Sequence, residues 1–98
     1  MNEDLSNIGF IGAGNMASAL IAGLVKNKYN NSQIFVSSPE EEHLKKLKDN
    51  FSVNVTEDNV EVVKSASTLV LAVKPNVIES VLDAVSYTHL TLPTIYSV

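Results

Sequence analysis

Short apolar runs alternate along this chain with longer segments in which apolar residues recur every three or four positions. The runs at 8–11, 33–37, 52–55 and 68–73 have the length of strands, and the segments between them have the spacing of amphipathic helices. Because strand and helix alternate, the strands should run parallel and be joined by right-handed crossovers. The pattern predicts an α/β fold, a Rossmann-type open parallel sheet with helices on both faces, here truncated.

Apolar spacing and capping residues place the helices. The first helix, which should end near Asn27, has one apolar face made of Met16, Ala19, Leu20, Gly23 and Leu24. The second should begin with Ser38 as N-cap, Pro39 at the first position and Glu41 closing a capping box, and its buried stripe is Leu44, Leu47 and Phe51. Asp58 or Asn59 should cap a brief third helix over 60–64, and a fourth carries Ile78, Val81, Leu82 and Val85.

A glycine turn joins the first strand to the first helix. Read as Gly-x-Gly-x-x-Ala, Gly12 permits the tight turn, Gly14 lets backbone approach a pyrophosphate, and Ala17 lets the helix pack closely on the strand. The N–H groups at a helix start attract anions. The loops at 12–16, 37–39 and 73–76 all follow strands, so they should share one rim of the sheet and form one nucleotide cleft.

Composition excludes several other functions. A net charge of −4 with only seven Lys and Arg residues argues against nucleic acid, which requires a basic face. There is no cysteine, and His43 and His89 have no partner at metal-ligand spacing, so we expect no metal site and a solvated surface position for His43. Neither a membrane span nor a signal peptide is evident, which favours the cytoplasm.

The last stretch of the chain departs from the pattern before it. Residues 85–94 resemble, codon by codon, the translation of a transposon adapter used in sequencing libraries. We therefore expect a cofactor-binding domain at 1–84, followed by a non-native tail at 85–98 that adds nothing to the fold. The alternative is a genuine strand followed by a turn at Leu92 and Pro93.

Three motifs on the predicted rim together resemble one enzyme family. They are GFIGAGNMA at 9–17, SSP at 37–39 and LAVKP at 71–75, and residues 7–84 as a whole look like the amino-terminal domain of pyrroline-5-carboxylate reductases. The resemblance implies a domain that binds NADPH or NADH. It also implies the activity of the whole enzyme, which reduces 1-pyrroline-5-carboxylate to L-proline, the last step of proline biosynthesis.

The resemblance further implies where the cofactor lies. The glycine turn, made of Gly12, Ala13, Gly14, Asn15 and Met16, would meet the pyrophosphate. Ser38 and Asn59 would lie near the adenosine ribose, and the loop of Ala72, Val73, Lys74 and Pro75 would line the nicotinamide side. Simpler roles exist for some of these residues, because Ser38 and Asn59 can be helix caps and Lys74 a solvated loop cation.

The family's carboxyl-terminal helical domain, which builds the substrate pocket and the dimer, has no counterpart in this sequence. We therefore expect no catalytic residue here, no turnover by this chain alone, and a homo-oligomer only with that second domain. Two enzymatic alternatives are the cofactor domain of a 3-hydroxyacid dehydrogenase and that of a deazaflavin-dependent NADP reductase. Outside enzymes, the alternative is a nucleotide-binding module that carries out no chemistry.

The residues after the second strand favour NADP over NAD. NAD-binding units usually place Asp or Glu there to accept from the ribose 2′-hydroxyl, whereas this chain has Ser37 and Ser38. Neutral hydroxyls do not repel a 2′-phosphate, but the glutamates at 40–42 oppose it. We expect a preference for NADPH of about tenfold or less, or about 1.4 kcal/mol.

Overall fold

A computed structural model describes residues 7–88 and 94–97 of the chain. Five parallel strands form one sheet in the order β3-β2-β1-β4-β5. The strands are β1 (Ile8–Ile11), β2 (Ile34–Ser37), β3 (Asn54–Thr56), β4 (Thr68–Leu71) and β5 (Thr94–Ser97). This is a Rossmann-like arrangement, and it confirms the predicted fold class.

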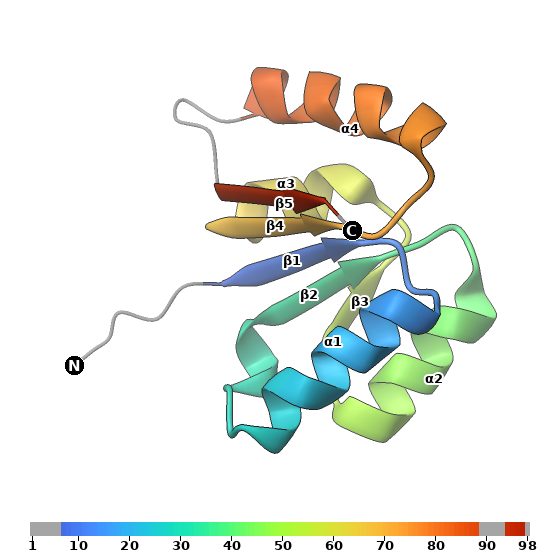
Figure 1. Ribbon diagram of the computed structural model, residues 1–98, viewed down its shortest axis with the longest axis vertical. Helices are drawn as coiled ribbons and strands as arrows, with labels where there is room; N and C mark the ends of the chain where they lie inside the picture. Colours follow the sequence, from blue (N-terminus) through green and yellow to red (C-terminus); the bar gives the residue numbers. More distant parts are fainter. Residues whose placement is uncertain (1–6, 89–93, 98) are drawn as a thin grey trace.

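The helices lie in two layers, one on each face of the sheet (Figure 1). On one face are α1 (Asn15–Lys26) and α2 (Glu41–Phe51), and on the other are α3 (Asn59–Ser65) and α4 (Pro75–Thr88). A short 3-10 turn, η1 (Asn31–Gln33), leads into β2. The chain builds outward from β1 to β3 and then returns to β4 on the other side of β1, so right-handed crossovers place the two helix pairs on opposite faces.

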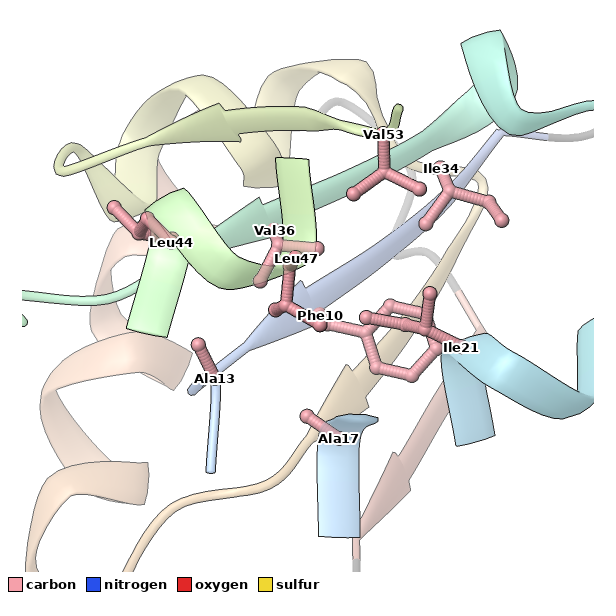
Figure 2. Packing of buried hydrophobic residues seen from close by; sticks show 9 residues of the cluster. All are labelled: Phe10, Ala13, Ala17, Ile21, Ile34, Val36, Leu44, Leu47 and Val53. Carbon is pink, nitrogen blue, oxygen red and sulfur yellow. The ribbon is translucent and has the colours of Figure 1, made fainter. Parts of the chain in front are cut away.

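The core on the α1 and α2 face is made of side chains that are almost fully buried. Figure 2 shows them between strands and helices: Phe10, Ala13, Ala17, Ile21, Ile34, Val36, Leu44, Leu47 and Val53. Leu44 and Leu47 are buried as predicted, with Phe51 packed partly against them. A second cluster fills the α3 and α4 face and consists of Ile11, Val62, Val63, Ala66, Leu69, Leu71 and Val81.

The apolar face predicted for α1 is wrong in large part, although Leu24 packs against the core as expected. The helix buries Ala17 and Ile21 against the sheet, whereas 58% of Met16 and 38% of Leu20 remain exposed. The helix has two apolar stripes, and periodicity alone did not distinguish them. The glycine turn fixes the rotation of the helix, because Ala17 must lie against the strand from which the turn leaves. The small side chain of Ala17 therefore has the packing role predicted for it.

The predicted start of α2 is also wrong, by two residues. The N-cap is Glu40, without a side-chain capping bond, and the helix begins at Glu41. Ser38 instead accepts a hydrogen bond at Oγ from the Glu40 N–H at 3.1 Å, and its own N–H donates to the carbonyl of Thr56 at 3.3 Å. These bonds hold Ser38 beside the end of β3, so it forms a local turn before the helix.

Part of the expected tail belongs to the fold. α4 continues through Thr88, and β5 pairs with β4 in the register that sets Thr94 beside Thr68. The Thr94 N–H also donates to the Ser67 carbonyl at 3.0 Å. The open edge of β4 presents unpaired backbone N–H and C=O groups, and almost any extended segment can form hydrogen bonds with them. The pairing therefore places few demands on the amino-acid sequence of β5. Residues 89–93 and 98 lie outside the described residues, and the non-native origin of the tail stays a prediction.

Close packing of β1 against α3 explains Gly9. A Cβ placed there would lie 2.5 Å from Val62 Cγ1 and 2.9 Å from Ala66 Cβ, whereas a Cβ on Gly23 in α1 would meet nothing within 4 Å. We predict that Gly9→Ala lowers the free energy of unfolding by about 1–3 kcal/mol through overpacking. Gly23→Ala, the matched control, should raise it by about 0.5–1 kcal/mol because Ala is the better helix former.

Urea unfolding followed by circular dichroism measures both changes. Adding Val62→Ala to Gly9→Ala should recover part of the loss, since it removes the nearest clashing atom. Equal effects of the two alanines, or a neutral Gly9→Ala, would contradict the packing account.

Candidate functional site

The turn from β1 to α1 is held between two neighbouring strands. The Gly12 N–H donates to the Ser37 carbonyl at 2.8 Å, and the Ala72 N–H donates to the Ile11 carbonyl at 2.9 Å. Gly12 has φ +107°, and a Cβ there would overlap the carbonyl oxygen of Ala72 and lie 2.9 Å from Val73 Cγ1. Only glycine fits both the conformation and the space. The turn therefore brings the ends of β1, β2 and β4 into contact.

Gly14 differs from Gly12 because it has open space around it. It is exposed, its φ is −80°, and a Cβ there would meet nothing within 4 Å. It is also the N-cap of α1, with no side-chain capping bond, and the Ser18 N–H donates to its carbonyl at 2.9 Å. The N–H groups of Asn15, Met16 and Ala17, in the first turn of α1, precede that bond and can donate hydrogen bonds to an anion. The open space beside Gly14 and the N–H donors of the first turn of α1 together fit a phosphate group.

A cleft of about 520 Å³ opens at this turn. It lies at the carboxyl ends of β1, β2 and β4, where the strand order reverses and where open α/β sheets bind their ligands. The residues lining it come from the three predicted loops and from the first turns of α1, α2 and α4: Gly12, Ala13, Gly14, Met16, Ser38, Pro39, Glu40, His43, Ala72, Val73, Lys74 and Val77.

Most of the predicted site residues meet in this cleft. The structure brings together Gly12, Ala13, Gly14, Met16, Ser38, Ala72, Val73 and Lys74. Asn15, Asn59 and Pro75 are not among the lining residues. The contacts of all eleven with a cofactor stay predictions.

Asn59 makes a hydrogen bond within the protein, to the end of β2. Its Oδ1 accepts a hydrogen bond from Ser37 Oγ at 2.6 Å, and Ser37 is completely buried. Asn59 is the first residue of α3, while Asp58 caps the helix by accepting from the Val60 N–H at 2.9 Å. Asn59 therefore ties the end of β2 to α3, and of the two serines only Ser38 faces the cleft.

Four lining residues were not among the predicted cofactor-binding residues: Pro39, Glu40, Val77 and His43. Pro39 lies in a loop that was predicted to form the cleft, and Glu40 is one of the glutamates expected near a 2′-phosphate, so sequence reasoning missed Val77 and His43. His43 was expected to be a solvated surface residue, but only 38% of its side chain is exposed. It precedes Leu47 by four positions and so shares that buried residue's side of α2. Together with its position in the first turn, this spacing is the signal that could have found it.

The charged groups near the cleft separate into two sets. Glu40, His43 and Lys74 are the ionisable residues among those that line it. Glu41 and Glu42 do not line it. A hydrogen bond with the Glu41 carboxyl and the repulsion of its charge raise the pKa of the exposed Glu57 carboxyl. Of the three consecutive glutamates, only Glu40 therefore bears directly on a ligand in the cleft.

The described part of the chain holds neither a cluster of metal ligands nor a membrane-spanning helix. No three His, Cys, Asp or Glu side chains gather there to hold a metal ion. No helix within the described ranges has both the length and the apolar character needed to cross a membrane.

Comparison with known proteins agrees with this geometry. The family described as NADP oxidoreductase, coenzyme F420-dependent, matches residues 7–92. Pyrroline-5-carboxylate reductase of Vibrio alginolyticus is 38% identical over 85 residues, which are 84% of this chain and 31% of that protein. The chain thus spans about a third of the length of its curated relatives.

Solved structures give the same result. The pyrroline-5-carboxylate reductase of Coxiella burnetii matches 97% of this chain and 36% of its own, with a TM-score of 0.89 and 34% identity. The Plasmodium falciparum pyrroline carboxylate reductase, solved with NADP bound, matches 94% of this chain and 32% of its own, with a TM-score of 0.74 and 29% identity.

Coenzyme F420, which the description of this family names, is a deazaflavin. The family description is therefore compatible with the alternative of a deazaflavin-dependent NADP reductase. The curated relatives at 36–42% identity are pyrroline-5-carboxylate reductases. The chain belongs to the family of NADP oxidoreductases described as coenzyme F420-dependent, and it corresponds to the amino-terminal NAD(P)-binding domain of the pyrroline-5-carboxylate reductases.

Proposed function

We propose that this chain binds NADPH across the cleft and forms the cofactor-binding part of a reductase that converts 1-pyrroline-5-carboxylate to L-proline. The observation that carries the proposal is the glycine turn. Gly12 is held where no side chain fits, and Gly14 opens onto empty space beside an uncapped helix start. A turn that only connected a strand to a helix would not need the second glycine.

In this proposal, different residues of the cleft contact different parts of the dinucleotide. First-turn N–H groups of α1 bind the pyrophosphate, Ser38 lies by the adenosine ribose, and the loop from Ala72 to Lys74 follows the nicotinamide. When bound, the reduced nicotinamide supplies the hydride. The contribution of this chain is to hold the ring in a fixed orientation, which accounts for much of the catalytic effect in such reactions.

The rest of the reaction is proposed for the whole protein. The relatives are about three times as long as the matched segment, so we assign the substrate pocket, turnover and any homo-oligomer to parts beyond the residues described here. We expect no turnover by the 98-residue chain alone. We propose that the protein is located in the cytoplasm.

The preference for NADPH follows from the polar groups after β2. Ser38 presents no carboxylate to a 2′-phosphate, and the NADP-bound relative from Plasmodium falciparum supports the same choice. The exposed carboxylate of Glu40 opposes the phosphate from the same side of the cleft. These opposing effects support a modest preference.

We predict that Gly14→Val abolishes NADPH binding without unfolding the chain. A Cβ at this position would meet no protein atom within 4 Å, so a valine side chain extends into the space in which the pyrophosphate would lie. Calorimetric titration should show at least about a hundredfold loss of affinity. The free energy of unfolding should fall by less than about 1 kcal/mol, the usual effect of replacing an N-cap. Unchanged NADPH affinity in Gly14→Val would overturn the proposed function.

Ser38→Asp should reverse the cofactor preference. A carboxylate accepts hydrogen bonds from the 2′-hydroxyl of NADH and repels the 2′-phosphate of NADPH. It can also still accept from the Glu40 N–H, so the local turn is kept. We expect the ratio of NADPH to NADH affinity to change from at most about tenfold in favour of NADPH to a preference for NADH. Ser38→Ala, which adds no charge, is the control; an unchanged ratio in Ser38→Asp would remove Ser38 from the cofactor site.

A further inference from the structure

We infer that His43 and Glu40 act in opposition to set the choice between NADPH and NADH, with His43 contacting the 2′-phosphate and Glu40 disfavouring it. The inference rests on the proposed function, which already has Glu40 oppose the phosphate, and adds His43 as a specificity-determining residue paired with it. Both belong to the start of α2 and line the cleft at the glycine turn.

The position of His43 in the cleft is the first part of the argument. In a sheet of this order, the adenosine half of a dinucleotide lies toward the end of β2, and the nicotinamide lies toward β4. The lining residues that follow β2 are Ser38, Pro39, Glu40 and His43, whereas Lys74 follows β4. Among the described lining residues, His43 is therefore the one group on the adenosine side that can carry a positive charge.

The geometry of the pair is the second part. His43 Nδ1 lies 3.7 Å from Glu40 Oε1, and the His43 N–H donates to the Glu40 carbonyl at 3.2 Å. The side chains are 38% and 65% exposed, so a ligand in the cleft can reach both. Imidazole has a second nitrogen on the opposite side of the ring. With Nδ1 toward the carboxylate, Nε2 remains for a phosphate oxygen.

Charge gives the two residues opposite effects. A phosphate monoester carries a charge of about −1.5 to −2 at neutral pH, so a nearby carboxylate repels it and an imidazole N–H attracts it. The Glu40 carboxylate can also accept from the ribose hydroxyls, as the acidic residue of NAD-binding units does. Glu40 therefore favours NADH and His43 favours NADPH. Lys74 is the other charged group of the cleft, and it is common to both cofactors because it lies on the nicotinamide side.

The test compares variants of the 98-residue chain by calorimetric titration with NADPH and NADH. We expect His43→Gln to weaken NADPH binding by about five- to tenfold and NADH binding by less than about twofold. Glu40→Gln should strengthen NADPH binding by about threefold or more and weaken NADH binding. Lys46→Gln is the matched control, since it also removes a positive group from α2 but is exposed and lies outside the cleft; it should alter neither affinity by more than about twofold.

A smaller pair of ligands isolates the phosphate contact. His43→Gln should weaken adenosine 2′,5′-bisphosphate but leave adenosine 5′-monophosphate unchanged, because only the first has a 2′-phosphate. Melting temperatures near that of the parent chain verify folding, and His43→Asn provides a second variant. If the parent binds both dinucleotides but the NADPH to NADH ratio is the same in His43→Gln and Glu40→Gln, the inference is overturned while the proposed function stands. If the parent binds neither dinucleotide, both are overturned.

Discussion

The backbone turn at Gly12 is the constraint on which the rest of this domain depends. Its N–H is bonded to the end of β2, the residue before it accepts from the loop after β4, and there is no room for a side chain. Three strand ends are thereby fixed at one point, and the rotation of α1 is fixed with them. The cleft, the helix start at its base and the residues of α2 on its rim all take their positions from this turn.

The glycines of the motif serve two separate purposes. Gly9 and Gly12 are required by the protein itself, because a Cβ at either would strike α3 or the loop after β4. The packing of the protein does not require Gly14, since a Cβ there would meet nothing within 4 Å. Ordering a glycine on folding costs more conformational entropy than ordering any other residue. Because Gly14 avoids no clash within the protein, we attribute the space beside it to a ligand. This contrast separates a phosphate-binding turn from a structural one more directly than the spacing of the motif does.

Periodicity predicted the fold class, since apolar runs and helical stripes follow from strand and helix geometry alone. It misassigned most of the buried face of α1, which has two apolar stripes and is oriented by the glycine turn. It also misplaced the start of α2, because Ser38 accepts a local hydrogen bond from the Glu40 N–H. His43 was missed because it directly follows three glutamates, which suggested a solvated surface, although it lines the cleft. The pairing of β5 with β4 could not be predicted from pattern either, because an edge strand is specified mainly by the backbone of its neighbour.

The central claim is that a dinucleotide lies across the glycine turn, and an amide NMR titration of the chain with NADPH tests it most directly. The account predicts the largest shifts at the N–H groups of Gly14, Asn15 and Met16, with further shifts at Ser38 and His43 and none at Lys64 on the far face in α3. Saturable shifts confined to other surfaces, with the amides of the glycine turn unmoved, would contradict it.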